Sequence, residues 1–337
     1  TSSPTLYNVD GTSSTNTITF RPASGTKKDV VINAGSNQAF IFSGSQYVII
    51  DGRPGGTGNN VKLTIKNNSI EYPVLEFEDD SKNITIQYCK ILGQNQATLA
   101  NAGVIHFGRG TTTGNEQITI DNCEVGPNGT AYPVYLIYSY GSYSSVLNKK
   151  IVISNCKFYD WRATGAISNP AAIWLLNTTN CYILNNSFYQ SSDFGAASNT
   201  ISAIKVWDGT DYVIQGNKIG GSAPDLGGNA WKVIVTADYY QFVGIDCLFS
   251  SGGNNIIKNN TIAKIDFLSS LGTTSGGGTW CCGIQIRNGK FNVSKNKVYK
   301  IICNNAGANV VGIYTTSGTG TFSNNMVSLG NDITGDV

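Results

Sequence analysis

Charged side chains and histidine are scarce in this sequence. Asp, Glu, Lys and Arg together make up 13% of the 337 residues, the net charge is +2, and there is one histidine. Because the chain has no basic field to attract phosphates, we do not expect a nucleic-acid partner. Because the cysteines form no CxxC pair and no cluster with histidine, we predict neither a metal site nor a cofactor.

Long apolar runs are absent as well. No segment is long enough to cross a bilayer, and no signal peptide is recognisable at the N-terminal end. Hydrophobic residues nevertheless make up 40% of the chain, which suffices for a core and argues against disorder. The Ser/Thr-rich start and the end just past a repeat lead us to expect that residues 1–337 are one domain of a longer surface protein.

An eight-residue pattern recurs along the chain. Alternate residues are apolar, and Asn or Cys then stands two places before another apolar residue. Such alternation is typical of strands and does not fit a helix. The pattern occupies residues 63–70 (LTIKNNSI), 84–91 (ITIQYCKI), 118–125, 151–158, 182–188, 212–219, 256–262, 291–298 and 321–327.

A second strand pattern precedes most of these octets. Two short strands joined by Gly-rich connections cannot bury their own inner faces, whereas stacked units close a continuous core. The sequence therefore predicts an all-β chain folded as a single right-handed parallel β-helix, a solenoid of roughly nine to eleven coils about 4.8 Å apart. The second pattern occupies residues 73–77, 103–107, 133–137, 171–175, 202–206, 243–247, 283–286 and 311–315.

The Asn or Cys of each octet is expected to form a ladder at a bend between sheets. An inward Asn can bond to the coils above and below it, and Asn tolerates the left-handed backbone that such bends use. The alternative is that these residues only mark exposed turns. The predicted ladder comprises Asn68, Cys89, Cys123, Cys156, Asn186, Asn217, Asn260, Asn296 and Asn325.

Three consecutive ladder positions are cysteines. Parallel stacking about 4.8 Å apart keeps their Cβ atoms farther apart than the roughly 3.5–4.5 Å of a disulfide. We therefore predict that Cys89, Cys123 and Cys156 are buried free thiols, which pack as small apolar groups. Cys247 is expected on the inner face of its strand. One disulfide remains an open alternative among the cysteines nearer strand ends, which are Cys181, Cys281, Cys282 and Cys303.

The N-terminal region resembles a known family of repeat proteins. Residues 17–25 read TITFRPASG, residues 30–35 read VVINAG, and residues 47–67 read YVIIDGRPGGTGNNVKLTIKN. This is similar to a segment of extracellular right-handed β-helix proteins of Bacteroidota, in which a VTIDGRPGGTG-like phrase precedes LTI. The resemblance, which is most specific over residues 17–70, implies an extracellular or cell-surface location and export by type IX secretion. A phosphate-binding loop is not expected at the glycines, because no helix follows them.

Long, uneven connections are expected to leave the rod at one corner and to form a wall beside the outward face of the second-strand sheet. The wall and the face would enclose a shallow lateral groove, where exposed aromatic side chains could stack on sugars. In coil order the outward positions are Glu76, His106, Leu136, Trp174, Lys205, Asp246, Gln285 and Tyr314. From these we select as ligand-binding candidates Trp174, Tyr314, Lys205, Asp246, Glu76 and His106.

No catalytic residues are predicted from this set. A glycosidase needs two carboxylates within about 10 Å, whereas Glu76 and Asp246 are five coils apart, roughly 24 Å. Lys205 and Asp246 are expected to form an exposed ion pair. His106 beside Glu76 could act as an acid–base pair, but a lone histidine near a carboxylate is more often structural.

We therefore favour a non-enzymatic, structural or adhesive surface module that binds glycans along the groove. The main alternative is a carbohydrate-active enzyme, a polysaccharide lyase or glycoside hydrolase on a pectate-lyase-like β-helix, and a third reading is a passive carbohydrate-binding module. The expected partners are polysaccharide or another surface protein. Because an open terminal coil is an unpaired edge, neighbouring domains or subunits are expected to cap both ends.

Overall fold

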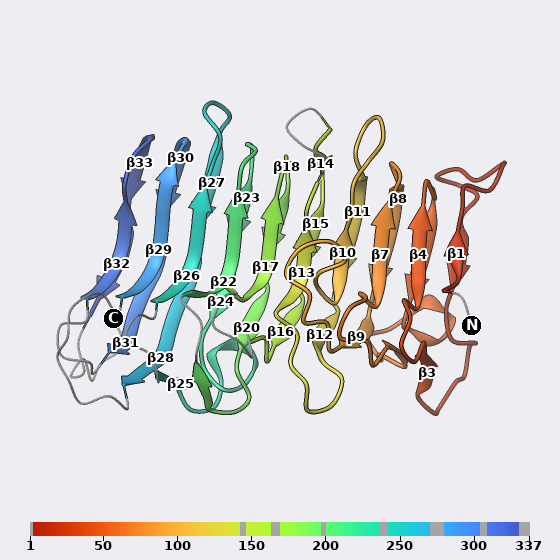
Figure 1. The fold of residues 1–337 in the computed structure, drawn as a ribbon, viewed down its shortest axis with the longest axis horizontal. Coiled ribbons are helices and arrows are strands. Elements are labelled where there is room, and N and C mark those ends of the chain that lie inside the picture. Colours follow the sequence, from red (N-terminus) through yellow and green to blue (C-terminus); the bar gives the residue numbers. More distant parts are fainter. Residues whose placement is uncertain are drawn as a thin grey trace.

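The chain is a right-handed parallel β-helix, as the sequence predicts. The computed structural model describes residues 3–141, 146–162, 169–196, 200–235, 241–269, 280–303 and 309–329. Within these ranges three parallel sheets run the length of the molecule, and successive coils follow one another from the N-terminal to the C-terminal end (Figure 1). No helix in the described part of the chain is long and apolar enough to cross a membrane.

The first sheet carries the outward row in which the candidate residues lie. Its strands, in spatial order, are β1 (Thr5–Leu6), β4 (Phe40–Ser43), β7 (Leu75–Glu78), β10 (Ile105–Phe107), β13 (Tyr135–Ser139), β17 (Ala171–Leu176), β22 (Thr200–Trp207), β26 (Gln241–Leu248), β29 (Trp280–Asn288) and β32 (Asn309–Thr315).

The second sheet is formed mainly by the first halves of the octets. Its strands are β2 (Ile18–Phe20), β5 (Val48–Asp51), β8 (Lys82–Gln87), β11 (Glu116–Asp121), β15 (Val152–Ser154), β19 (Tyr182–Leu184), β23 (Val213–Gln215), β27 (Asn255–Lys258), β30 (Lys290–Ser294) and β33 (Thr319–Ser323), with β14 (Asn148–Lys149) and β18 (Thr178–Thr179) beside them.

The third sheet takes up the second halves of the octets. Its strands are β3 (Val30–Asn33), β6 (Leu63–Lys66), β9 (Cys89–Gly93), β12 (Glu124–Pro127), β16 (Lys157–Tyr159), β20 (Ser187–Tyr189), β24 (Lys218–Ile219), β28 (Thr261–Ser269), β25 (Trp231–Val235), β21 (Phe194–Ala196), β31 (Lys297–Cys303) and β34 (Met326–Ser328). Two short 3-10 turns, η1 (Pro54–Gly56) and η2 (Pro224–Leu226), lie in connections.

Each octet from 84–91 onward bends between the second and third sheets, so one coil has three strands where the sequence indicated two. In residues 118–125, β11 ends at Asp121, β12 begins at Glu124, and Cys123 stands between them. The left-handed residue of the bend is the one before the ladder position, for example Asn122 with φ 50° and Asn185 with φ 53°. The ladder side chain itself is therefore free to point inward.

The amides of the ladder bond from coil to coil. Nδ2 of Asn186 donates to Oδ1 of Asn217 at 3.1 Å, and Nδ2 of Asn217 donates to Oδ1 of Asn260 at 3.0 Å. The same bonding continues through Asn296 to Asn325. Toward the N-terminal end the cysteines take over, and the backbone N–H of Cys156 donates to Oδ1 of Asn186 at 2.9 Å.

The prediction for Asn68 is wrong. The register pairs Leu63 with Cys89, so the strand that opens octet 63–70 lies in the third sheet and Asn68 follows it as an exposed residue. The reason is an insertion at the corner after β5: Lys62 N–H donates to Gly52 O at 2.9 Å, so residues 53–61 form a loop outside the coil. The loop contains residues 53–58 (RPGGTG), a part of the segment that carries the family resemblance.

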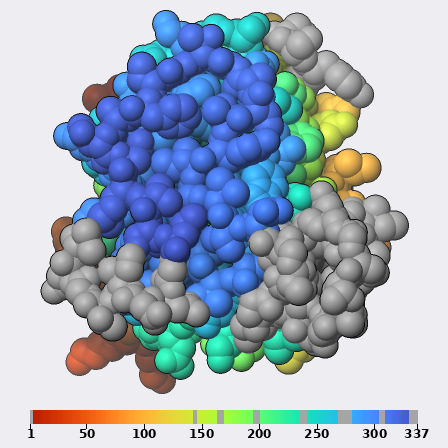
Figure 2. Space-filling view, turned by 90° about the vertical axis from the view of Figure 1, so that its left-hand side faces the viewer, coloured from red at the N-terminus to blue at the C-terminus, as the bar shows by residue number. Residues whose placement is uncertain are grey.

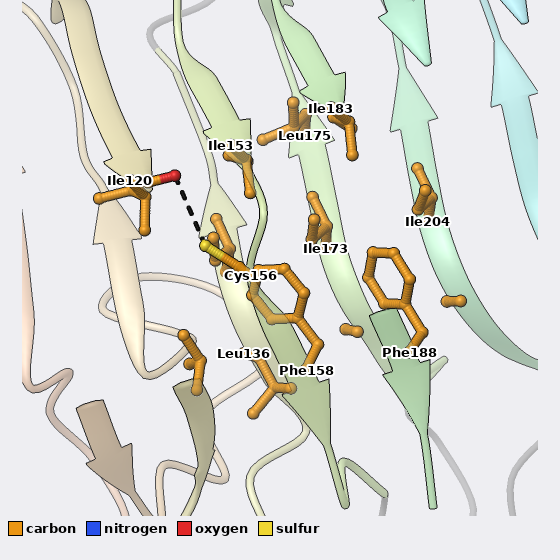
Figure 3. Close-up of a cluster of buried hydrophobic side chains, with 14 of the residues drawn as sticks. Ile120, Leu136, Ile153, Cys156, Phe158, Ile173, Leu175, Ile183, Phe188 and Ile204 are labelled. Carbon is orange, nitrogen blue, oxygen red and sulfur yellow. Dashed lines mark hydrogen bonds between the residues drawn. The ribbon is translucent and has the colours of Figure 1, made fainter. Parts of the chain in front are cut away.

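The interior is a continuous column of stacked apolar side chains. Phe42, Phe77 and Phe107 succeed one another with ring centroids 4.8 and 5.0 Å apart. Figure 3 shows Phe158 and Phe188 in the same relation, beside the thiol of Cys156, which donates to the carbonyl oxygen of Ile120 at 3.5 Å. The cysteines of the ladder, together with Cys247, are buried free thiols in this structure.

The C-terminal end of the described chain leaves apolar side chains uncovered. Phe322 is 46% exposed and Val327 is 44% exposed, and Figure 2 looks onto the coils that carry them. That a neighbouring domain or subunit covers this end remains a prediction.

Candidate ligand-binding site

The six candidate residues lie in a single row on the outward face of the first sheet. The register places His106 beside Glu76, Lys205 beside Trp174, and Asp246 beside Lys205. The full row, in coil order, is Glu76, His106, Tyr138, Trp174, Lys205, Asp246, Gln285 and Tyr314.

Tyr138 occupies the place in the row that the sequence assigned to Leu136. The register pairs Ile105 with Ile137, so residues 133–137 are two residues out of step with residues 103–107, and Leu136 is buried in the core. The next outward side chain is consequently Tyr138, whose ring lies 5.9 Å from the ring of His106.

Much of the row is covered, so it does not form the continuous open groove that we expected. Lys205 is 2% exposed and Asp246 is fully buried, which contradicts the expected exposed ion pair. Among the described residues the ion-pair partner of Asp246 is Arg287, whose Nε and Nη2 donate to the two carboxylate oxygens at 2.9 and 3.1 Å. The guanidinium therefore closes the row over this carboxylate.

Lys205 is held between two indole rings. Its Nζ lies 4.3 Å from the ring centroid of Trp174 and 4.2 Å from that of Trp207. Burial lowers the pKa of Lys205 to about 8. These contacts assign Lys205 and Trp174 to the packing of the outward face of the first sheet.

Tyr314 is the most accessible of the six candidates. It is 41% exposed and packs edge-on against Trp280, with ring centroids 5.1 Å apart. It lies next to Gln285 at the C-terminal end of the row, far along the rod from Glu76 and His106.

The row opens into a cleft at Glu76 and His106. The cleft has a volume of about 390 Å³, within the range of roughly 300–1,000 Å³ that is usual for small-molecule sites. The residues that line it are Glu76, Glu78, Asp79, Ala100, Asn101, His106, Gly108, Arg109 and Tyr140.

Gly108 forms the floor of the cleft, because it has no side chain to fill the space above its backbone. Side chains two residues apart on a strand share a face, so Glu78, Gly108 and Tyr140 follow Glu76, His106 and Tyr138 as a second outward row on consecutive coils. The N–H of Gly108 donates to Phe77 O, and the N–H of Tyr140 donates to Phe107 O, which continues the register. A space without a side chain thus separates the carboxylate of Glu78 from the ring of Tyr140.

The rim of the cleft is anchored by Asp80. Its carboxylate accepts hydrogen bonds from the backbone N–H groups of residues 111–114 at 2.8–3.0 Å and from the hydroxyl of Thr111 at 2.6 Å. This turn follows Arg109, whose guanidinium lies 5.1 Å from the ring centroid of Tyr140. Arg109, the cation of the cleft, is therefore attached to a turn that the hydrogen bonds of Asp80 hold in place.

Burial shifts the ionisation of the cleft. It lowers the pKa of His106 to about 4, so the imidazole is neutral at pH 7. Burial raises the pKa of Glu76, and burial together with the charges of Glu76 and Asp79 raises the pKa of Glu78 to about 6. No group of three or more His, Cys, Asp or Glu side chains in the described residues is arranged to hold a metal ion.

Reasoning from the sequence did not select Glu78, Asp79, Gly108, Arg109 or Tyr140. Two of them had a usable signal, because Glu78 and Gly108 stand two residues after Glu76 and His106 on the same strand face. Arg109 and Tyr140 had none, because their positions depend on the turn that follows β10 and on the correct phase of β13.

Comparisons with known proteins add little to this geometry. No protein-family model and no curated protein matches the sequence. Two solved structures of PfbA, a surface adhesin of Streptococcus pneumoniae, are similar to the chain. One has 13% identity and a TM-score of 0.49 over 91% of this chain and 72% of its own; the other has 11% identity and 0.45 over 94% and 83%. At these values the likeness carries no inference about function.

Proposed function

We propose that this chain is a non-enzymatic module of the bacterial surface, or of a secreted protein, that binds glycan in the cleft between Glu78 and Tyr140. The observation that carries the proposal is the cleft itself, in which Gly108 leaves space between polar groups and an aromatic ring. Sugars are bound by such a combination, because hydroxyls bond to the polar groups while the ring packs on C–H faces. The family resemblance of residues 47–58 supports the surface location and type IX export as parts of this proposal.

Filling the cleft tests the proposal. Gly108 has no left-handed φ, and a Cβ at this position would lie 3.3 Å from Phe77 O and 3.5 Å from the ring of His106, so a side chain here enters the cleft once the backbone oxygen shifts by a few tenths of an ångström. We expect Gly108→Val to abolish retention of the chain in affinity electrophoresis through polysaccharide gels. Thr85→Val, on the second sheet of the same coil as Glu78, should leave retention unchanged. Equal retention of both variants would refute the cleft as the site.

A second candidate, glycoside hydrolysis or polysaccharide lysis, is favoured by one observation. The pKa of Glu78 is raised to about 6, as expected of a carboxylic acid that donates a proton near neutral pH, and Glu76 lines the same cleft. Release of new reducing ends or unsaturated uronates by the wild-type chain, lost in Glu78→Gln, would establish this candidate in place of the first.

A further inference from the structure

The imidazole of His106 presents one hydrogen-bond acceptor to the cleft. Nδ1 of His106 lies 2.9 Å from the carbonyl oxygen of Ala102, and a carbonyl can only accept, so Nδ1 carries the proton. In the neutral ring Nε2 is then an acceptor. A Cβ added at Gly108 would lie 3.5 Å from Nε2, so this edge of a ring that is only 3% exposed faces the floor of the cleft.

The carboxyl groups add further acceptors. Oε2 of Glu76 accepts from Nε2 of Gln38 at 3.0 Å, and Oδ2 of Asp79 accepts from the hydroxyl of Ser43 at 2.7 Å. Each of these two carboxyl groups keeps a second oxygen. Glu78, the last residue of β7, stands between Glu76 and Asp79 in the sequence. Three carboxyl groups therefore line the cleft with one guanidinium, that of Arg109, and one carboxamide, that of Asn101.

This polarity specifies the chemistry of the ligand. A buried acceptor without a donor is costly, so an acceptor-rich cleft selects a donor-rich ligand, and the excess of carboxyl groups selects a cation. A uronate or a sulfated sugar would be repelled. An ammonium supplies three donors, and neighbouring hydroxyls supply the rest, which favours a sugar over the single ammonium of a lysine side chain.

We propose that the cleft of Glu76, Glu78, His106 and Tyr140 binds a sugar unit that carries a free ammonium group, as in de-N-acetylated hexosamine. The ammonium lies among the carboxylates of β7, its neighbouring hydroxyls bond to Nε2 of His106, and the sugar face packs on Tyr140. This inference rests on the proposed glycan-binding function and names its ligand class.

The test compares glucosamine oligosaccharides with N-acetylglucosamine oligosaccharides of equal length by isothermal titration calorimetry at pH 7. The two series share one skeleton and differ at one nitrogen, which is a cationic ammonium in the first and a neutral acetamide in the second. We expect the acetylated series to bind at least tenfold more weakly, Glu78→Gln to weaken binding of the free amine about tenfold, and Gly108→Val to abolish it. Thr85→Val is the matched control and should bind as the wild type does.

The possible outcomes distinguish the ammonium assignment from the proposed glycan-binding function on which it rests. Binding of acetylated or neutral oligosaccharides that equals the free amine and is lost in Gly108→Val would keep the cleft as a glycan site and overturn the ammonium assignment. Amine binding that survives both Gly108→Val and Glu78→Gln would be surface attraction and would also overturn it. Tighter binding of a lysine-containing peptide would overturn the assignment to a sugar. Absence of binding by every glycan would overturn both proposals.

Discussion

The carboxamide oxygen of Asn260 accepts two hydrogen bonds from Asn217, one from the side-chain amide and one from the backbone N–H, both at 3.0 Å. Because the same pair of bonds recurs at each amide step of the ladder, one buried side chain fixes both the bend of its own coil and the spacing to the next. A rod held in this way keeps the first sheet in register and therefore keeps the cleft residues of consecutive coils together.

Replacing Asn217 by Ala should weaken the rod at its middle. The substitution removes Oδ1 of residue 217, the acceptor of both the backbone N–H and the side-chain amide of Asn186, and it removes the Nδ2 donor to the carbonyl oxygen of Ile183. An unsatisfied buried polar group costs about 1–3 kcal/mol, so we expect a loss of about 2–4 kcal/mol in urea unfolding. Asn292→Ala, at an exposed position of β30, should change stability by less than about 0.5 kcal/mol. A similar loss in both variants would show that the ladder has no special role.

The thiols of Cys89, Cys123 and Cys156 should resist alkylation in the folded chain. All three side chains are buried, so a reagent cannot reach the sulfur atoms until the chain unfolds, and burial also raises the pKa of Cys156. Under denaturing, non-reducing conditions all three should be alkylated, as intact mass would show. Unmodified cysteines at these sites after denaturation would instead indicate disulfides.

Removing the guanidinium of Arg287 should be costly, because the buried carboxylate of Asp246 would lose both of its guanidinium hydrogen bonds and keep only the charge of the neighbouring Lys205. We expect Arg287→Met to lower the free energy of unfolding by about 3 kcal/mol. The double variant Arg287→Met with Asp246→Asn should recover most of this loss. If the double variant is less stable than the single one, the ion pair does not explain the burial of this row.

Glu78→Gln should stabilise the chain in a pH-dependent way. The folded pKa of Glu78, about 6, lies above its ordinary value of 4.5, so the folded state favours the protonated acid and the ionised form destabilises it as the pH rises through this window. The gain of the Gln variant should be absent at pH 4 and reach at most about 2 kcal/mol at pH 8. Thermal unfolding at both pH values measures it, and Glu76, Asp79, His106 and Arg109 are the neighbouring charged or titratable groups present in both proteins. A gain that is equal at both pH values would contradict the raised pKa.

The fold was predictable because alternation and the Asn/Cys position are local signals that repeat. The position of one octet within its coil was not predictable. The inserted loop after β5 places the strand of residues 63–70 in the third sheet without changing their pattern. The candidate row was predicted apart from Tyr138, whose place depends on an offset of two residues between segments 103–107 and 133–137. Its burial was not predictable, since it depends on how Trp207 and Arg287 fold over Lys205 and Asp246.

The location of the bound sugar tests the account most directly. Hydrogen–deuterium exchange, followed by mass spectrometry with and without a glucosamine oligosaccharide, should show slowed exchange in peptides that contain residues 76–80, 106–114 and 138–141. The Gly108→Val variant should show no such protection. Protection confined to the region of Tyr314, or unchanged in Gly108→Val, would contradict the claim that this cleft is the binding site.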